Sequence, residues 1–265
     1  MIYRNRFKGQ VHDQSFTVVC YTHQVNPEMG RRFRPAVIVC AGGAYANRSA
    51  TEEEGVAVQY QAQGFQAFVL EYSVGKQFPQ ALRELAALVS FLRTNDVVFD
   101  VDPKQIFVCG FSAGGHLACS LGVFFGSDIL TQYFPDKELI RPDGLILCYP
   151  VITAGEYTHQ ESMRNLMRAD GNWEAVSLEK YVNANMPRTF IWHTLDDDLV
   201  PVDNSFMLID AMRKHQVSFE CHIFPYGCHG LALATELTAV SEDHINESVA
   251  QWFDLSVMWM KRARI

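Results

Sequence analysis

Residues 108–116 read VCGFSAGGH and carry the strongest signal of the fold in this chain. Ser112 is the centre of a Gly-x-Ser-x-Gly pattern, between an apolar run that ends at Phe111 and an apolar segment that begins near Gly115. Between a strand and a helix, this pattern places the serine on a sharp, strained turn with its hydroxyl exposed above the sheet. The alternative is a glycine-rich turn with an incidental serine, and the rest of the chain has to distinguish the two.

The sequence on either side of that turn predicts a doubly wound α/β domain. Short runs that are apolar on both faces suit the buried strands of a parallel sheet, and they occur at 36–41, 66–72, 105–111, 144–149, 189–193 and 219–224. Segments with apolar residues near the helical period occur at 52–63, 79–95, 116–125, 205–215 and 245–261. This alternation predicts a mostly parallel sheet with helices on both faces. Residues 16–25 are expected to add one or two antiparallel edge strands.

The chain has 265 residues, a length that suits one large core, so we expect a single domain over residues 1–265. One interval breaks the rhythm, because residues 151–187 contain no clear strand and are rich in polar side chains. Irregular segments of this length in compact domains are usually functional. We therefore expect residues 151–187 to form a small helical cap over the carboxyl edge of the sheet.

A serine hydroxyl needs a general base, and in a fold of this kind the chain order is serine, then acid, then histidine. His229 lies in the glycine-flanked loop 224–230 (FPYGCHG), after the last apolar strand and therefore at the sheet edge where ligands bind. His193 is the rival base, but it precedes the acid and breaks the chain order. Three acidic candidates, Asp196, Asp197 and Asp198, follow the strand 189–193, and their composition alone does not choose among them.

A tetrahedral intermediate also needs donors for its oxyanion. The backbone N–H of Ala113, the residue after the nucleophile, is the expected first donor. The loop 41–45 (AGGAY) follows the first central strand, and its small residues let the backbone of Gly43 and Ala44 approach the oxyanion. A plain tight turn or a phosphate loop is the alternative, but the chain contains neither a Walker A sequence nor a G-x-G-x-x-G pattern here.

Charge and cysteine content narrow the class of partner. The net charge is −8, from 22 basic and 30 acidic residues, which argues against nucleic acid and anionic membranes as partners. No apolar stretch reaches the roughly 20 residues of a membrane span, and no apolar signal region follows the basic N-terminus. The seven cysteines are odd in number and form no C-x-x-C pair, which is typical of reduced thiols in a cytoplasmic protein. No metal or cofactor is implied.

Four blocks of the chain, in order, resemble the esterase branch of the α/β-hydrolase superfamily, close to bacterial acetyl esterases and acetylxylan esterase-like proteins. They are the glycine-rich loop 42–45, the nucleophile turn 108–118, the acid loop 192–201 (WHTLDDDLVP) and the histidine loop 224–230. The resemblance runs from about Pro35 to Trp252. Two positions depart from the family pattern, since Ala41 replaces a Pro or His and Ala44 replaces a third Gly.

The resemblance implies that Asp197, three residues before the Val of the Val-Pro pair, is the acid that orients His229. It implies hydrolysis of short-chain carboxylic esters, with O-acetyl groups on a sugar or similar polyol as the expected small-molecule substrate. Tyr45, Tyr149 and Trp173 are candidate substrate-binding residues, although aromatic side chains at such positions often only pack.

Two other readings of the same residues remain open at this stage. A serine peptidase of the prolyl-oligopeptidase type uses the same triad, but the chain lacks a propeller-sized N-terminal domain. A non-catalytic binding protein with this fold is the second alternative, and the presence of all three triad members counts against it. The oligomeric state is also open, because an edge strand or the C-terminal helix could pair subunits.

Overall fold

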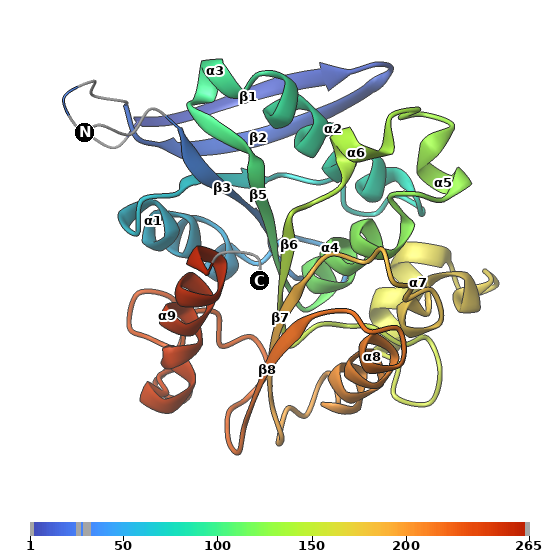
Figure 1. Ribbon diagram of the computed structural model, residues 1–265. Helices are drawn as coiled ribbons and strands as arrows, with labels where there is room; N and C mark the ends of the chain where they lie inside the picture. The colour runs from blue at the N-terminus through green and yellow to red at the C-terminus, as the bar shows by residue number, and fades with distance from the viewer. Residues whose placement is uncertain (1–2, 25–27, 29–32, 263–265) are drawn as a thin grey trace.

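The computed structural model describes residues 3–24, 28 and 33–262. Its strands form one eight-stranded sheet in the order β1-β2-β4-β3-β5-β6-β7-β8, which twists through the centre of the molecule (Figure 1). β3 to β8 pair in parallel, whereas the β1–β2 and β2–β4 pairs are antiparallel. The strands are β1 (Tyr3–Val11), β2 (Gln14–Thr22), β3 (Arg34–Cys40), β4 (Gln66–Leu70), β5 (Val101–Phe111), β6 (Gly144–Cys148), β7 (Thr189–Thr194) and β8 (Phe219–Phe224). The mostly parallel α/β sheet expected from the sequence is therefore confirmed.

The expectation of one or two antiparallel edge strands at residues 16–25 is met in the direction of pairing but not at the edge itself. β2 is antiparallel, but it lies inside the sheet between β1 and β4, and β1 is the strand at the edge. Val25, the last residue of the predicted strand, lies outside the described residues. The sequence signal of β1 is weak because most residues of this strand are polar and exposed, among them Arg4, Asn5, Arg6, Lys8 and Gln10.

Helices cover both faces of the sheet, as the apolar runs predicted. Every residue of β4, β6 and β7 is buried, since helices shield both sides of these strands. One hydrophobic cluster joins the sheet to α1 and α9, and the other joins its opposite face to α2, α4 and α8; Figure 1 shows the two groups on opposite sides. The longer helices are α1 (Glu54–Ala62), α2 (Gln80–Thr94), α4 (Ala113–Phe124), α8 (Asp203–Lys214) and α9 (Glu247–Lys261), and the short ones are α3 (Asp96–Phe99), α5 (Asp128–Thr131) and α6 (Lys137–Ile140).

The irregular segment after β6 folds back toward the carboxyl edge of the sheet. It contains α7 (Gln160–Met167) and two short 3-10 helices, η3 (Trp173–Val176) and η4 (Leu178–Lys180). Asn165 donates a 2.9 Å hydrogen bond to the carbonyl oxygen of Ala44, and the carbonyl oxygen of Val176 accepts from His116 at 2.9 Å. These contacts place the segment against the loop after β3 and the first turn of α4.

No helix among the described residues is long and apolar enough to span a membrane.

Candidate active site

Ser112 lies at the sharp turn between β5 and α4, as the sequence predicted. Its backbone has φ 51° and ψ −117°, a strained conformation for a residue with a side chain. The turn is held by a 3.0 Å hydrogen bond from the Ser112 N–H to the carbonyl of Cys148. Gly114 must be glycine, because a Cβ there would lie 2.1 Å from the carbonyl oxygen of Cys40. The serine is 6% exposed, at the carboxyl end of the central strands.

The structure brings Ser112, His229 and Asp197 into one chain of hydrogen bonds. His229 Nε2 lies 2.8 Å from the Ser112 hydroxyl oxygen, and His229 Nδ1 lies 2.7 Å from Asp197 Oδ2. The carboxylate can only accept, so Nδ1 carries the hydrogen and Nε2 is the acceptor that faces the serine. This arrangement can remove the serine proton and stabilise the positive charge that then develops on the imidazole.

Asp197 is held from four directions. Its Oδ1 accepts from the backbone N–H groups of Leu199 at 3.0 Å and Val200 at 2.9 Å. Its Oδ2 accepts from His229 and, at 3.1 Å, from His193 Nε2. Burial alone would raise the pKa of Asp197, but the hydrogen bonds from His193 and His229 and the backbone hold it well below its usual range. Asp197 is therefore ionised at neutral pH.

His193, the rival base in the sequence, contacts Asp197 and not Ser112. Its Nε2 faces two acceptors, Asp197 Oδ2 and the Val200 carbonyl at 2.9 Å, so Nε2 carries a hydrogen. Its Nδ1 then accepts from the Ser205 hydroxyl at 2.8 Å. The side chain is fully buried. His193 thus supports the aspartate and does not face the serine.

The neighbours of Asp197 have different surroundings. Asp196 and Asp198 are both exposed, and Asp196 accepts a 2.6 Å hydrogen bond from the backbone N–H of Gly227 in the histidine loop. Of the three adjacent carboxylates, only Asp197 points into the site and contacts His229.

The loop after β3 presents backbone donors near the serine. The backbone of this loop has positive φ angles at Gly43 (φ 114°) and Ala44 (φ 53°). Gly42 packs against the serine, because a Cβ at position 42 would lie 2.8 Å from Ser112 Cβ. Within the described part of the chain, the backbone N–H groups of Gly43, Ala44 and Ala113 donate to no protein acceptor. Their N–H groups are therefore available for an oxyanion.

Two of the predicted substrate-binding residues, Tyr45 and Tyr149, have buried side chains that contact other residues of the protein. Tyr45 is 2% exposed and its hydroxyl lies 2.8 Å from His116 Nδ1, which joins the loop after β3 to α4. Tyr149 is 1% exposed, and its ring packs against the His229 ring with centroids 4.9 Å apart. Their substrate role stays a prediction. Trp173 is half-buried, and its Nε1 donates to the Arg168 carbonyl at 2.8 Å, so its substrate role stays a prediction.

Three polar residues at the site were missed in the sequence. Glu52 is buried behind the loop after β3, although it stands in the acidic run 52–54. His159 belongs to the irregular segment. Burial lowers its pKa, and the electrostatic influence of His229 lowers it further, which indicates that the two histidines are near each other. Asn204 is fully buried and accepts from the backbone N–H groups of Ile152 and Thr153 at 2.9 and 3.0 Å.

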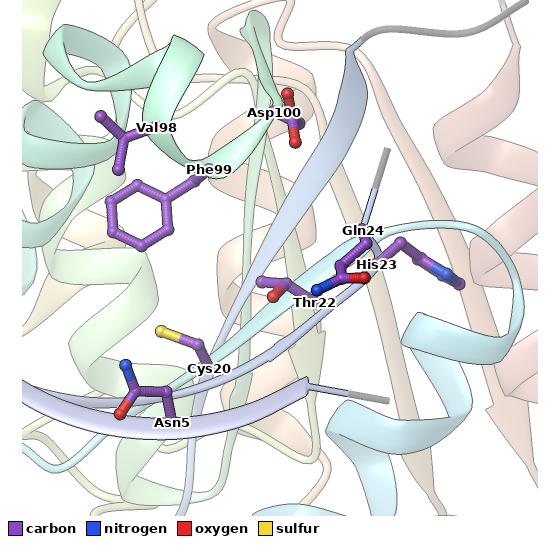
Figure 2. A pocket seen from close by; sticks show the side chains of 8 residues that line it. All are labelled: Asn5, Cys20, Thr22, His23, Gln24, Val98, Phe99 and Asp100. Atoms are coloured by element: carbon purple, nitrogen blue, oxygen red, sulfur yellow. The ribbon is translucent and has the colours of Figure 1, made fainter. Parts of the chain in front are cut away.

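A separate cavity of about 230 Å³ lies far from Ser112. Figure 2 shows its lining side chains, among them Asn5, Cys20 and Phe99. Asp100, also in its lining, immediately precedes β5, whereas Ser112 follows the carboxyl end of the same strand. The cavity is thus at the opposite edge of the sheet from the serine. The described residues include no group of three or more His, Cys, Asp or Glu side chains placed to hold a metal ion.

Comparisons with known proteins agree with this geometry. The BD-FAE family model matches residues 24–212. The chain is 39% identical to endo-1,4-beta-xylanase B of Butyrivibrio fibrisolvens over 213 residues, which cover 77% of this chain and 33% of that protein. It is 28% identical to an acetylxylan esterase of Xylanibacter ruminicola over 235 residues, which cover 84% of this chain and 45% of that protein. The chain therefore spans less than half the length of these two relatives.

One solved structure is similar over nearly the whole chain. It is an acetyl ester-xyloside bifunctional hydrolase from Caldicellulosiruptor lactoaceticus, with a TM-score of 0.82 and 34% sequence identity. The match covers 93% of this chain and 87% of that one.

Proposed function

Since the chain belongs to the BD-FAE family of α/β-hydrolases, we propose that it is a serine carboxylesterase for short-chain esters, with O-acetyl groups on carbohydrate as its substrates. The observation that carries the proposal is the unbroken path of hydrogen bonds from the Ser112 hydroxyl through His229 to Asp197. The relatives named as acetylxylan esterase and as acetyl ester-xyloside hydrolase support the choice of substrate class.

The proposed reaction has two halves. Ser112 Oγ attacks the ester carbonyl carbon while His229 Nε2 takes its proton, and the carbonyl oxygen becomes an oxyanion that accepts from the N–H groups of Ala113 and of Gly43 or Ala44. The intermediate collapses, the carbon–alcohol bond breaks, and the imidazolium returns the proton to the leaving alcohol. A water molecule then attacks the acyl-enzyme with His229 as base, which releases the acid and restores the Ser112 hydroxyl.

We propose that residues 151–187 act as the cap that shapes the acyl and alcohol pockets. Asn204 supports this role, because it joins the segment to the acid loop: its amide donates to the Tyr157 carbonyl at 2.9 Å and to the Pro201 carbonyl at 3.0 Å. The half-buried His159 lies in the same segment near His229. These contacts support a cap that is anchored to the acid loop next to His229.

Hydrolysis of p-nitrophenyl esters from acetate to octanoate tests the proposal. We expect activity on acetate and propionate that falls with each added methylene, since a pocket that rejects one methylene discriminates by about 1–3 kcal/mol. Ser112→Ala should reduce kcat by a factor on the order of 10⁴ to 10⁶. Ser120→Ala is the matched control, because it removes a buried hydroxyl from the same helix without touching the triad.

Release of acetate from acetylated xylan then tests the substrate class. Equal, feeble rates for the wild-type protein and Ser112→Ala on every ester would contradict the proposal. Activity on the p-nitrophenyl esters but none on acetylated xylan would keep the esterase and remove the carbohydrate substrate.

A further inference from the structure

Glu52 is a buried carboxylate that the proposed reaction does not use. It lies at the end of a short 3-10 helix (Ala50–Glu52) and is 2% exposed. Among the described residues, no Lys or Arg forms an ion pair with it. A buried carboxylate without a cationic partner is costly, so the contacts that hold it at this position need an explanation.

The two oxygens of Glu52 each contact one of the two loops that flank Ser112, one directly and one through Tyr149. Oε2 accepts a 2.6 Å hydrogen bond from the backbone N–H of Gly42, next to the expected oxyanion donors. Oε1 accepts a 2.7 Å hydrogen bond from the Tyr149 hydroxyl. The Tyr149 hydroxyl oxygen in turn accepts from the backbone N–H of Ala232 at 3.0 Å, three residues after His229.

Both carboxylate oxygens of Glu52 act as acceptors in this arrangement. The N–H groups of Gly42 and Ala232 can only donate, so the Tyr149 hydroxyl directs its own hydrogen at Glu52. Burial raises the pKa of Glu52, and the hydrogen bonds from Tyr149 and Gly42 oppose that rise.

We infer that Glu52 is a positioning residue that holds the loop after β3 through Gly42 and the segment after His229 through Tyr149 and Ala232. This inference rests on the esterase proposed above. Tyr149 supplies the second half of the link, because its ring also packs on the His229 ring. One carboxylate thus fixes the donor side and the base side of the reaction relative to each other.

The test compares Glu52→Gln with Tyr149→Phe, using p-nitrophenyl acetate. Glu52→Gln keeps the shape of the side chain but removes its charge. Its amide nitrogen then takes the place of an oxygen that accepts from the Gly42 N–H or from the Tyr149 hydroxyl. Tyr149→Phe keeps the charge and the ring but cuts the link to Ala232. Glu54→Gln is the matched control, because it removes one negative charge from an exposed position two residues along. Thermal unfolding of each variant shows that it is folded.

We expect both variants to lower kcat by about 10- to 100-fold with KM within a factor of about 3, as small misplacement of reacting groups does. Glu54→Gln should keep both constants at the wild-type values. A fall in kcat at nearly constant KM, in a variant with the wild-type melting temperature, is a readout that a purely structural role would not produce.

Wild-type kcat in folded Glu52→Gln would overturn the inference. If Glu52→Gln does not fold, Tyr149→Phe carries the test, and wild-type kcat in that variant overturns it. Ser112→Ala separates this outcome from failure of the proposed function: a dead Ser112→Ala with fully active Glu52→Gln refutes only the role of Glu52, whereas an active Ser112→Ala refutes the esterase mechanism itself.

Discussion

Replacing Asp196, Asp197 and Asp198 in turn by Asn identifies which of them orients His229, a choice that the sequence alone could not make. In Asp197→Asn, the amide oxygen must stay on the side of the Leu199 and Val200 N–H groups, because the amide nitrogen there would face two donors. The amide nitrogen then faces His229 Nδ1 in place of Oδ2. It donates to Nδ1, so the ring hydrogen moves to Nε2 and faces Ser112, and the base has the wrong tautomer.

The expected loss in Asp197→Asn is about 10⁴-fold in kcat, as for other triads with this change, or about 5.4 kcal/mol at 1.36 kcal/mol per factor of ten. His193 does not rescue the variant, because its Nε2 hydrogen already has the Val200 carbonyl as a second acceptor. The assay is steady-state hydrolysis of p-nitrophenyl acetate at pH 7, with thermal unfolding of each variant. Asp198→Asn, exposed, should retain kcat within a factor of about 2. A loss below tenfold in folded Asp197→Asn would refute the reasoning.

Two further predictions concern stability. Burial lowers the pKa of His116 to about 4, below its ordinary value near 6.5. Between these two pH values the unfolded chain binds a proton that the folded chain does not, so the free energy of unfolding decreases as the pH is lowered, by about 2 kcal/mol between pH 7 and pH 5 for this residue. Urea unfolding of His116→Gln should lack this part of the pH dependence, and an unchanged dependence would contradict a neutral buried ring. Gly114→Ala should destabilise the protein by about 3 kcal/mol or more, since its Cβ would lie 2.1 Å from the Cys40 carbonyl oxygen. Gly126→Ala is the control, because a Cβ at this exposed position meets only Lys137 Cδ at 3.7 Å. Equal melting temperatures for the two variants would contradict the close approach at the turn.

The sequence predicted the sheet and the positions of Ser112 and His229 because each depends on a local signal. Strands buried on both faces are continuous apolar runs, and every residue of β4, β6 and β7 is indeed buried. The serine turn requires small residues at fixed spacing, which the sequence displays directly. β1 escaped prediction because an edge strand carries polar residues on its exposed face, and its pairing with β2 is set by a turn at His12, where φ is 52°.

The parts of the site that the sequence did not reveal depend on long-range packing. Glu52 stands in the acidic run 52–54, which has the composition of a solvated helix start, yet Glu52 is buried while Glu54 is exposed. Tyr45 and Tyr149 were expected at the pocket because aromatic residues often line such sites. Both side chains are buried, and both residues have a left-handed backbone (φ 60° and 37°), which composition does not report.

The central claim, that Ser112 is the nucleophile, is tested most directly by labelling with a fluorophosphonate probe followed by peptide mass mapping. We expect one label per chain, on the peptide that contains Ser112, with no labelling of Ser112→Ala and a rate that falls sharply in Asp197→Asn. A wild-type protein that stays unlabelled, or that carries the label on another residue at the same rate in Ser112→Ala, would contradict the account.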